Sequence, residues 1–440
     1  MKHFFKVGLL FLALLSSATL CAQQSWTLAE CIQYAKENNL SIKQQALNIS
    51  QVQNQLEQSK WALAPSLSAS SGYNLSWGRS VNQQDLTIIE NQLSQSGSFS
   101  LSASVNLFDG LQNTNTIKQN QTQLEISEQE VEKLKNDLSV EIARNFLQVI
   151  LAKEMLEATH LSFQSVSEQV ERTHKLVDAG NLAHSNLLEL QAQLAAEQVQ
   201  VVNAENNLRT ATLSLRQILD LPLDADFQIT HPQVSIEEKS FSGADVDRLY
   251  TQSQNLPQII MANHTVQLRE HQLAIAKGRR YPSLSLSAGI GTNYNPDLAE
   301  SFFHQLDNRR SPYVGLSLRI PIFSNMSIKT SISNARLTVQ MSQIEMRNRQ
   351  QMLYKEIQQA NNDAISCFQR YQATEQNVKA IQESFRYVQQ RFDLGMLNGT
   401  DYTVAKNNLF RAQSDNLQAK YQYVFQLKIL DFYKGIPITL

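Results

Sequence analysis

The sequence has little charge and few residues suited to catalysis. Charged side chains make up 18% of its 440 residues and the formal net charge is -2, so no polyanion-binding surface is indicated and nucleic acid is not an expected partner. The eight histidines are scattered, and the chain shows no Ser/His/Asp set, no paired carboxylates and no glycine-rich phosphate loop after a strand. We therefore expect neither an enzyme nor a cofactor or metal site.

Long apolar runs and cysteines are also scarce. Beyond the first residues no segment approaches about 18 consecutive apolar side chains, so any membrane insertion must use strands instead of helices. Of the three cysteines, only Cys31 and Cys367 lie outside the N-terminal leader. They are too few for a disulfide scaffold and lack metal-ligand spacing. We expect both to be buried as small apolar side chains.

Residues 1–22 have the pattern of an export signal. A basic start and an apolar run over 7–15 give way to small residues, and the run is too short to cross a membrane. Cys21 leaves two alternatives open, removal with the signal or lipidation. We favour removal, because Leu20 occupies the position where a lipoprotein signal needs a small residue, and we expect the mature chain to begin near Gln23.

Four segments alternate apolar residues with serine, glycine or asparagine, which predicts strands with one apolar face. They cover 66–77, 98–106, 283–294 and 314–320. A soluble sheet with one buried face is the alternative. Strands of about ten residues that carry a small, nearly uncharged polar face fit a membrane barrel better. The aromatic girdle of that barrel is expected at Tyr73, Trp77, Phe99 and Tyr294.

Four strands cannot close a barrel by themselves. An open sheet edge in lipid would leave backbone donors and acceptors unpaired, at several kcal/mol each, so copies of the chain must complete the barrel. Eight strands from a dimer would leave a lumen filled by side chains, whereas twelve from a trimer could leave a water path. The small residues of the polar face favour the trimer.

Proline and glycine are absent from two long stretches, 111–176 and 325–394. Each stretch predicts a helix of roughly 100 Å. Apolar residues recur at steps of three and four in the second stretch and again after residue 187, where only Glu197 breaks the pattern, as in a coiled-coil seam. We interpret these residues as packing positions. The turns near Gly180 and Gly395 are then the ends most distant from the membrane and the expected docking sites.

The chain also contains an internal duplication. Segment 63–68 returns as 280–285, and 177–180 returns as 392–395, each about 216 positions later. The predicted divisions are a signal peptide (1–22), a periplasmic helix (23–64), an outer-membrane β-hairpin (65–108), a long periplasmic helical hairpin (109–220), an equatorial linker between the repeats (221–244), a second periplasmic helix (245–281), a second β-hairpin (282–322), a second helical hairpin (323–434) and a C-terminal tail (435–440).

Residues 26–32, with Asn38 and Asn39, and residues 391–395, followed by Asp401, resemble the TolC-like outer membrane efflux protein family over essentially the whole mature chain. The resemblance implies an α+β membrane protein in which a homotrimer forms a 12-stranded β-barrel, four strands per chain. A long α-helical coiled-coil barrel, built from two tandem structural repeats, would continue it into the periplasm.

This resemblance also implies a function and partners. The chain would be the outer membrane channel of a tripartite efflux or type I secretion system in a Gram-negative bacterium. Its expected partners are a periplasmic adaptor (membrane fusion) protein, an inner-membrane transporter of the RND or ABC type, and outer membrane lipid. A lumen lined by Ser, Asn and Gln selects weakly, so the sequence is compatible with drugs, metals, metabolites or proteins as cargo.

The resemblance further implies a gate near the second tip. Relatives carry two acidic rings there; Asp401 aligns with one, whereas Val404 occupies the position of the other. The latch tyrosine of some relatives is Phe392 here and its basic partner is Leu397, which leaves Arg391 or Asp393 to build a latch. The residues expected to dock the adaptor are Gly180, Asn181, Arg391, Phe392, Asp393 and Gly395.

Two interpretations of Asp401 stay open. Three such carboxylates around a narrow axis would repel one another and attract cations, which would make the pore cation-selective. Alternatively, Asp401 only stabilises the first turn of its helix. For the whole chain, the alternatives to a channel are a trimeric surface adhesin, whose strands would lie together at the C-terminus, and a soluble periplasmic coiled-coil scaffold.

Overall fold

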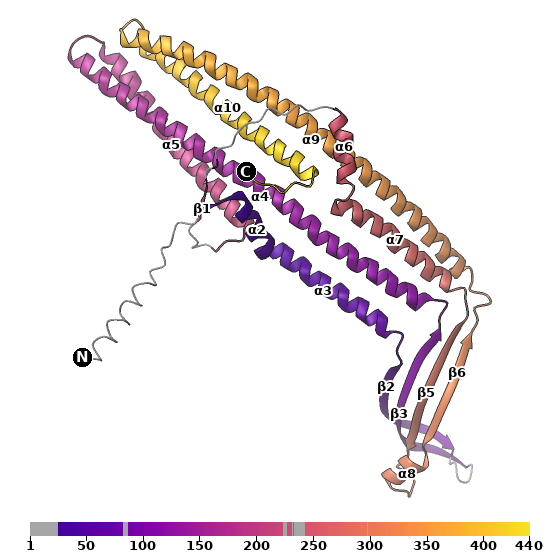
Figure 1. Ribbon diagram of the computed structural model, residues 1–440. Helices are drawn as coiled ribbons and strands as arrows, with labels where there is room; N and C mark the ends of the chain where they lie inside the picture. The colour runs from indigo at the N-terminus through magenta and orange to yellow at the C-terminus, as the bar shows by residue number, and fades with distance from the viewer. Residues whose placement is uncertain (1–24, 82–86, 223–226, 231, 233–242, 297) are drawn as a thin grey trace, which may run out of the picture. The chain divides into compact units, whose positions relative to one another are not determined.

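The computed structural model describes residues 25–81, 87–222, 227–230, 232, 243–296 and 298–440 (Figure 1). The predicted signal peptide and much of the predicted equatorial linker lie outside these residues. Two compact units are present. Unit 1 comprises 1–44, 131–256 and 351–440, and unit 2 comprises 45–130 and 257–350. The units are therefore not the two halves of the chain, because each takes segments from both halves.

Unit 2 contains one antiparallel sheet in which the strands follow the order β2-β3-β5-β6 (Figure 1). The strands are β2 (Ser66–Val81), β3 (Ile88–Phe108), β5 (Ser283–Tyr294) and β6 (Ser311–Arg319). All four serine-alternating segments thus belong to the same sheet. The first two strands are longer than predicted, because backbone pairing continues past the end of the alternation through a register shift between Gly78 and Ser80.

Helices from the two halves of the chain match in length. They have 11 residues in α2 and α6, 22 in α3 and α7, 67 in α4 and α9, and 35 in α5 and α10. Their bounds are α2 Leu28–Asn38, α3 Leu40–Trp61, α4 Gln112–Asp178, α5 His184–Ile218, α6 Gly243–Ser253, α7 Pro257–Gly278, α9 Ser327–Asp393 and α10 Gly399–Tyr433.

The single helices expected over 23–64 and 245–281 are each two helices. Asn39 separates α2 from α3, and its side-chain oxygen accepts a hydrogen bond from the Ser41 N–H at 2.9 Å, which caps the start of α3. Pro257 is the first residue of α7. A proline at this position loses no hydrogen bond, because the first N–H groups of a helix have no partner within the helix. Periodicity alone did not reveal either break.

Three short elements were not predicted. Strands β1 (Ser25–Trp26) and β4 (Gln228–Ile229) pair in parallel, and α8 (Phe302–Asn308) lies in the connection between β5 and β6. Two-residue strands and a seven-residue helix are too short to show a period, so tertiary contacts define them. Within the described residues, no helix is both long and apolar enough to cross a bilayer.

The seam interpretation is confirmed for part of α5, where Leu187, Leu190, Val201, Ala211 and Leu215 are buried. The other predicted packing residues of α5 are partly buried. Cys31 is also fully buried, and its burial, reinforced by the Glu30 carboxylate, raises its pKa to about 12. Cys367 is half-buried, and burial raises its pKa as well. Both thiols therefore stay protonated at neutral pH and act as packing groups.

Candidate functional site

The polar face of the sheet is a ladder of hydroxyl groups. The register places Ser66 opposite Ser104, Ser68 opposite Ser102 and Ser70 opposite Ser100. Their hydroxyl oxygens are 3.0, 3.0 and 2.7 Å apart, so each pair shares a hydrogen bond. Glycines and serines of β5 continue this face, with Ser104 opposite Ser287 and Ser102 opposite Gly289. The side chains of this face are small, polar and uncharged along the ladder, which suits the lining of an aqueous passage.

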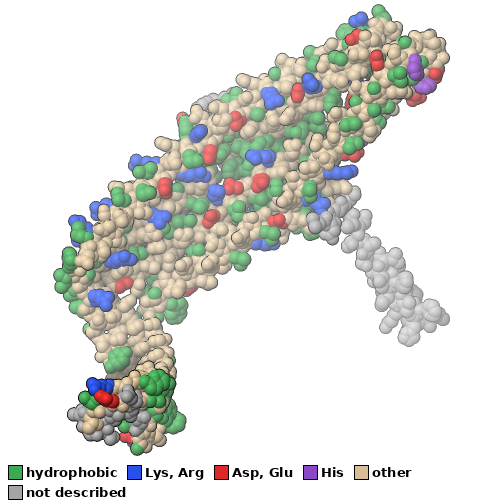
Figure 2. Space-filling view, turned by 180° about the vertical axis from the view of Figure 1, so that it is seen from behind, with side chains coloured by type: hydrophobic (Ala, Val, Ile, Leu, Met, Phe, Trp, Pro, Cys, Tyr) green, Lys and Arg blue, Asp and Glu red, His purple; other side chains and the backbone are tan. Residues whose placement is uncertain are grey.

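The opposite face of the sheet is apolar and exposed. The register aligns Leu101 with Ile290 and Ala288 with Val314, so the apolar residues of all four strands share this face. Leu67 is 71% exposed and Val314 is 77% exposed. Figure 2 shows hydrophobic side chains at the strand end, together with a few charged side chains. A continuous exposed apolar face requires an apolar environment.

The four residues predicted as an aromatic girdle all lie on the apolar face, but in two different settings. Trp77 is 74% exposed, and Tyr73 is exposed while its hydroxyl donates to Gln95 Oε1 at 2.6 Å. Phe99 and Tyr294 are instead half-buried against Phe302 of α8, with ring centroids 5.9 and 4.9 Å away. The girdle role stays a prediction for all four residues.

Both edges of the sheet are open within the described chain. β2 pairs only with β3, and β6 pairs only with β5. Each edge therefore presents a row of backbone N–H and C=O groups that water, lipid or another chain must meet. Lipid offers no hydrogen-bonding partner.

The two helical hairpins of unit 1 end in turns of identical geometry. Gly180 and Gly395 have φ angles of +73° and +72°, in the left-handed region that favours glycine. The N–H of each glycine donates to the carbonyl three residues earlier at 2.9 Å, and the next N–H donates five residues back, also at 2.9 Å. This Schellman motif satisfies the last carbonyls of α4 and α9. The predicted tip residues Gly180, Asn181 and Gly395 therefore lie in tight, exposed turns.

The two tips contact each other through an apolar cluster. Phe392, Tyr402 and Leu190 are buried together, and Leu397 packs against them. The rings of Phe392 and Tyr402 are 4.7 Å apart. Burial, followed by the nearby Asp393 carboxylate, raises the pKa of Tyr402. Phe392 is thus a packing residue within this chain and is only 6% exposed.

An ion pair lies beside the cluster. The Arg172 guanidinium of α4 donates to Asp393 Oδ1 at 3.1 Å, which joins the first hairpin to the second. Arg391, the other latch candidate, is exposed. Sequence reasoning missed Arg172, because nothing in the local pattern links it to a residue more than 200 positions away.

The predicted gate residues lie on α10, directly after the second tip. Asp401 is exposed in the first turn of the helix, and its backbone N–H donates to the capping Asn398 side chain at 2.8 Å. Val404 is 54% exposed. Two exposed apolar residues that were not predicted as site residues flank Gly395: Leu394 is 74% and Met396 is 64% exposed. The second tip therefore presents apolar surface as well as charge.

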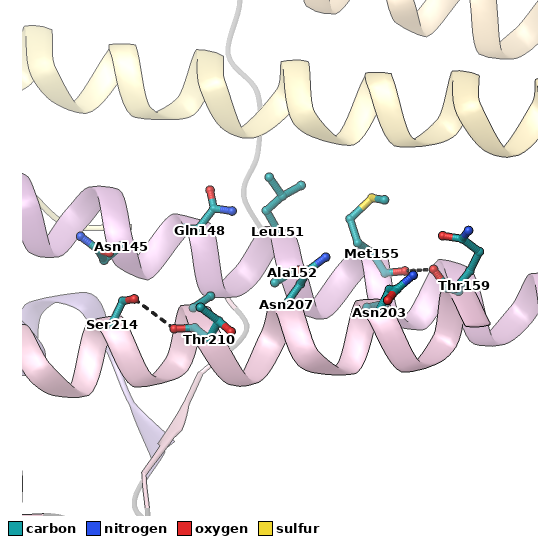
Figure 3. A pocket seen from close by; sticks show the side chains of 13 residues that line it. Asn145, Gln148, Leu151, Ala152, Met155, Thr159, Asn203, Asn207, Thr210 and Ser214 are labelled. Carbon is teal, nitrogen blue, oxygen red and sulfur yellow. Dashed lines mark hydrogen bonds between the residues drawn. The ribbon is translucent and has the colours of Figure 1, made fainter. Parts of the chain in front are cut away.

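A groove lined by uncharged side chains runs between α4 and α5 (Figure 3). Its volume is about 520 Å³, and its lining contains amides, hydroxyls and small apolar groups but no charged side chain. Thr159 and Ser214 satisfy their hydroxyls on backbone carbonyls of their own helices, at 2.7 and 3.0 Å. Such a surface can pack against another helix or hold water, and it offers no catalytic group. Within the described residues no cluster of His, Cys, Asp and Glu could hold a metal ion.

Lys406 is a buried lysine that the sequence analysis missed. It is 6% exposed, and its Nζ donates to the Ser162 carbonyl at 3.0 Å. Burial lowers its pKa to about 8, while Glu197 partly opposes the shift. Glu197 is also 6% exposed and accepts a hydrogen bond from Gln193 at 2.9 Å. Glu197, the one polar residue in the predicted seam, was therefore the sequence signal for a buried polar residue nearby, which is Lys406.

Known proteins resemble this chain over most of its length. The sequence profile of the outer membrane efflux protein family matches residues 31–220 and 249–435. Outer membrane protein TolC of Vibrio cholerae is 21% identical over 415 residues, which cover 91% of this chain and 88% of the relative. The proteases secretion protein PrtF of Dickeya chrysanthemi is 24% identical over 296 residues, which cover 66% of this chain and 62% of the relative.

Solved structures share the fold. The CmeC outer membrane channel of Campylobacter jejuni superposes with a TM-score of 0.79 at 16% identity, covering 94% of this chain and 86% of that one. The MtrE outer membrane channel of Neisseria gonorrhoeae, in its open state, gives a TM-score of 0.74 at 18% identity, covering 94% and 90%.

The buried Lys406 predicts a rise in stability with pH. The unfolded chain titrates this lysine near 10.5, whereas the folded chain does so near 8, so the unfolded state binds more protons between these values. The free energy of unfolding should therefore increase by about 3 kcal/mol across that window. Thermal unfolding followed by circular dichroism at pH 7 to 10.5 measures it.

Two variants isolate the contribution of this one group. Lys406→Met removes the amine but keeps a long unbranched side chain, and it should remove the rise. Lys379→Met, at a lysine whose side chain is 70% exposed, should keep it. Equal pH profiles for wild type and Lys406→Met would contradict the assignment.

Proposed function

The chain belongs to the outer membrane efflux protein family and is an outer membrane channel of an efflux or type I secretion system, and we propose that three copies of it form one pore. The main support for a trimer is the sheet, which has four strands, two open edges and one exposed apolar face. Pairing of β2 with β6 of the next copy satisfies both edges and closes twelve strands into a barrel. The apolar face then meets lipid and the serine ladder lines the lumen.

We further propose that the helices form a coiled-coil tunnel in the periplasm, built from two tandem repeats. The equal lengths of the matching helices support the repeats. An exposed apolar stripe on α5 supports packing of neighbouring copies against it. Its members, spaced to share one helix face, are Leu188, Val199, Val202 and Leu213, each more than half exposed.

The partners we propose are a periplasmic adaptor and an inner-membrane transporter of the RND or ABC type. The adaptor would dock at the hairpin tips, where Leu394 and Met396 join the predicted Gly180, Asn181 and Gly395. We propose transport without catalysis, since the pore lining offers hydroxyls and amides. A surface adhesin is not favoured, because the strand pairs β2–β3 and β5–β6 lie in distant parts of the sequence instead of together.

Conductance tests the proposed channel. The purified protein should remain in detergent as a trimer and open water-filled pores in planar bilayers, because twelve strands leave a lumen. Size measurement in detergent and single-channel recording are the readouts. A protein that stays dissolved as a monomer without detergent would rule out the channel and leave the soluble scaffold.

The same recordings test the proposed acidic ring. Asp401→Asn removes three charges from the axis of the trimer while keeping side-chain shape, so preference for cations over anions should fall several-fold. Asp137→Asn removes the same charge from an exposed ion pair on α4 and should have no effect. An unchanged ion preference in Asp401→Asn would leave Asp401 as a helix-stabilising residue only.

Photo-crosslinking tests docking at the tips. A benzophenone amino acid at Met396, which is 64% exposed, should capture a membrane-anchored periplasmic adaptor in cells. The same probe at Lys379, exposed on α9 but away from the turn, serves as the control. Equal capture at both positions, or identification of a protein unrelated to export machinery, would contradict docking at the tip.

A further inference from the structure

A groove of about 500 Å³ lies on the apolar face of the sheet, beside α8 and the residues that follow it. Side chains of three strands form its floor, and Leu306 and Arg310 form its wall. The floor includes Ala69 of β2, Phe99 and Leu101 of β3, and Ile290 of β5. The groove therefore lies on the face that the proposed function assigns to lipid.

Specific contacts hold the wall of the groove in place. Thr292 donates its hydroxyl to the Leu306 carbonyl at 2.9 Å. The fully buried Gln305 side chain accepts from the Asn295 N–H at 2.9 Å and donates to the Glu300 carbonyl at 2.8 Å. Phe302 packs on the rings of Phe99 and Tyr294. These contacts anchor the segment to the sheet, so the groove is built into the fold of unit 2.

A second copy of the chain cannot fill this groove by strand pairing. Neighbouring copies would add strands at the edges of β2 and β6, in the plane of the sheet. The groove instead opens on the face of the sheet, across the middle strands β3 and β5. Edge pairing therefore leaves it open to whatever surrounds the barrel.

Charge near the groove identifies the chemistry of the occupant. The Arg310 side chain lines the groove and is 61% exposed, although its guanidinium also contacts Asp307 at 3.2 Å. Arg310 is the one charged side chain among the residues that line the groove. An apolar floor beside a guanidinium group fits a molecule with a hydrocarbon chain and a phosphate.

We propose that the groove binds one phosphate-bearing lipid per chain, with an acyl chain along Phe99, Leu101 and Ile290 and the phosphate against Arg310. This site rests on the proposed function, since it requires the apolar face to meet a bilayer. It adds to that function a defined lipid position next to the predicted girdle residues Tyr73 and Tyr294, where the segment containing α8 acts as a clamp.

Native mass spectrometry of the detergent-solubilised protein tests the site, with dimyristoyl phosphatidylglycerol as the probe. The wild type should retain one tightly bound probe molecule per chain. Ser71→Phe places a ring in the groove and should weaken retention about tenfold, because it displaces buried methylene groups. Leu306→Ala removes part of the wall and should weaken it too, which keeps the test valid if Ser71→Phe fails to fold.

Matched controls separate the groove from general lipid binding. Leu318→Phe adds a ring on the same apolar face outside the groove lining and should leave retention unchanged. Arg310→Gln should weaken binding of phosphatidylglycerol but leave unchanged the binding of dimyristoylglycerol, which has no phosphate. Equal retention in wild type, Ser71→Phe and Leu306→Ala would overturn the site.

The same spectra distinguish this failure from failure of the proposed function. A trimer that binds lipid equally in all variants keeps the channel and removes the groove site. A monomer that needs no detergent removes both. Loss of binding in Leu318→Phe as large as in Ser71→Phe would also overturn the groove, since the effect would then belong to the whole face.

Discussion

An edge strand carries a row of backbone N–H and C=O groups that must be paired, and this chain has two such edges in a sheet whose outer face is apolar. In water the backbone groups of the edges could bond to water, but the apolar face would be exposed to it. In lipid the apolar face has a suitable environment, but the backbone groups of the edges have no hydrogen-bond partners. In the proposed pore, closure with further copies satisfies both requirements. The long helices α4 and α9 follow β3 and β6 along the chain, so they would take the same symmetry.

Much of the sheet was predictable because its determinants are local. Alternation of serine with apolar residues fixes which side chains share a face, and the observed register keeps that division across all four strands. The long helices were predictable for a similar reason: helix propensity is a property of each residue, and these stretches contain neither proline nor glycine. The helix breaks at Asn39 and Pro257 were not predicted, because a helix cap involves only two or three residues and the polar pattern continues across it.

The candidate site was less predictable, because its contacts join distant segments. Gly180 and Gly395 could be placed at turns from local sequence, and both occupy the left-handed conformation. The pairing of Arg172 with Asp393, the burial of Lys406 near Glu197, and the packing of α8 on Phe99 depend on which helices and strands become neighbours.

The relative weight of the tip contacts follows from their burial. The Arg172–Asp393 pair is half exposed on the arginine side, and such surface pairs contribute roughly 0–1 kcal/mol. Phe392, Tyr402 and Leu190 are almost fully buried, and burying a large apolar side chain contributes about 1.5–3 kcal/mol. The apolar cluster, and not the ion pair, therefore dominates the contact between the two hairpins. Phe392 and Leu397 contribute apolar packing to this contact, so separating the two hairpins at the tip would first require hydration of the cluster.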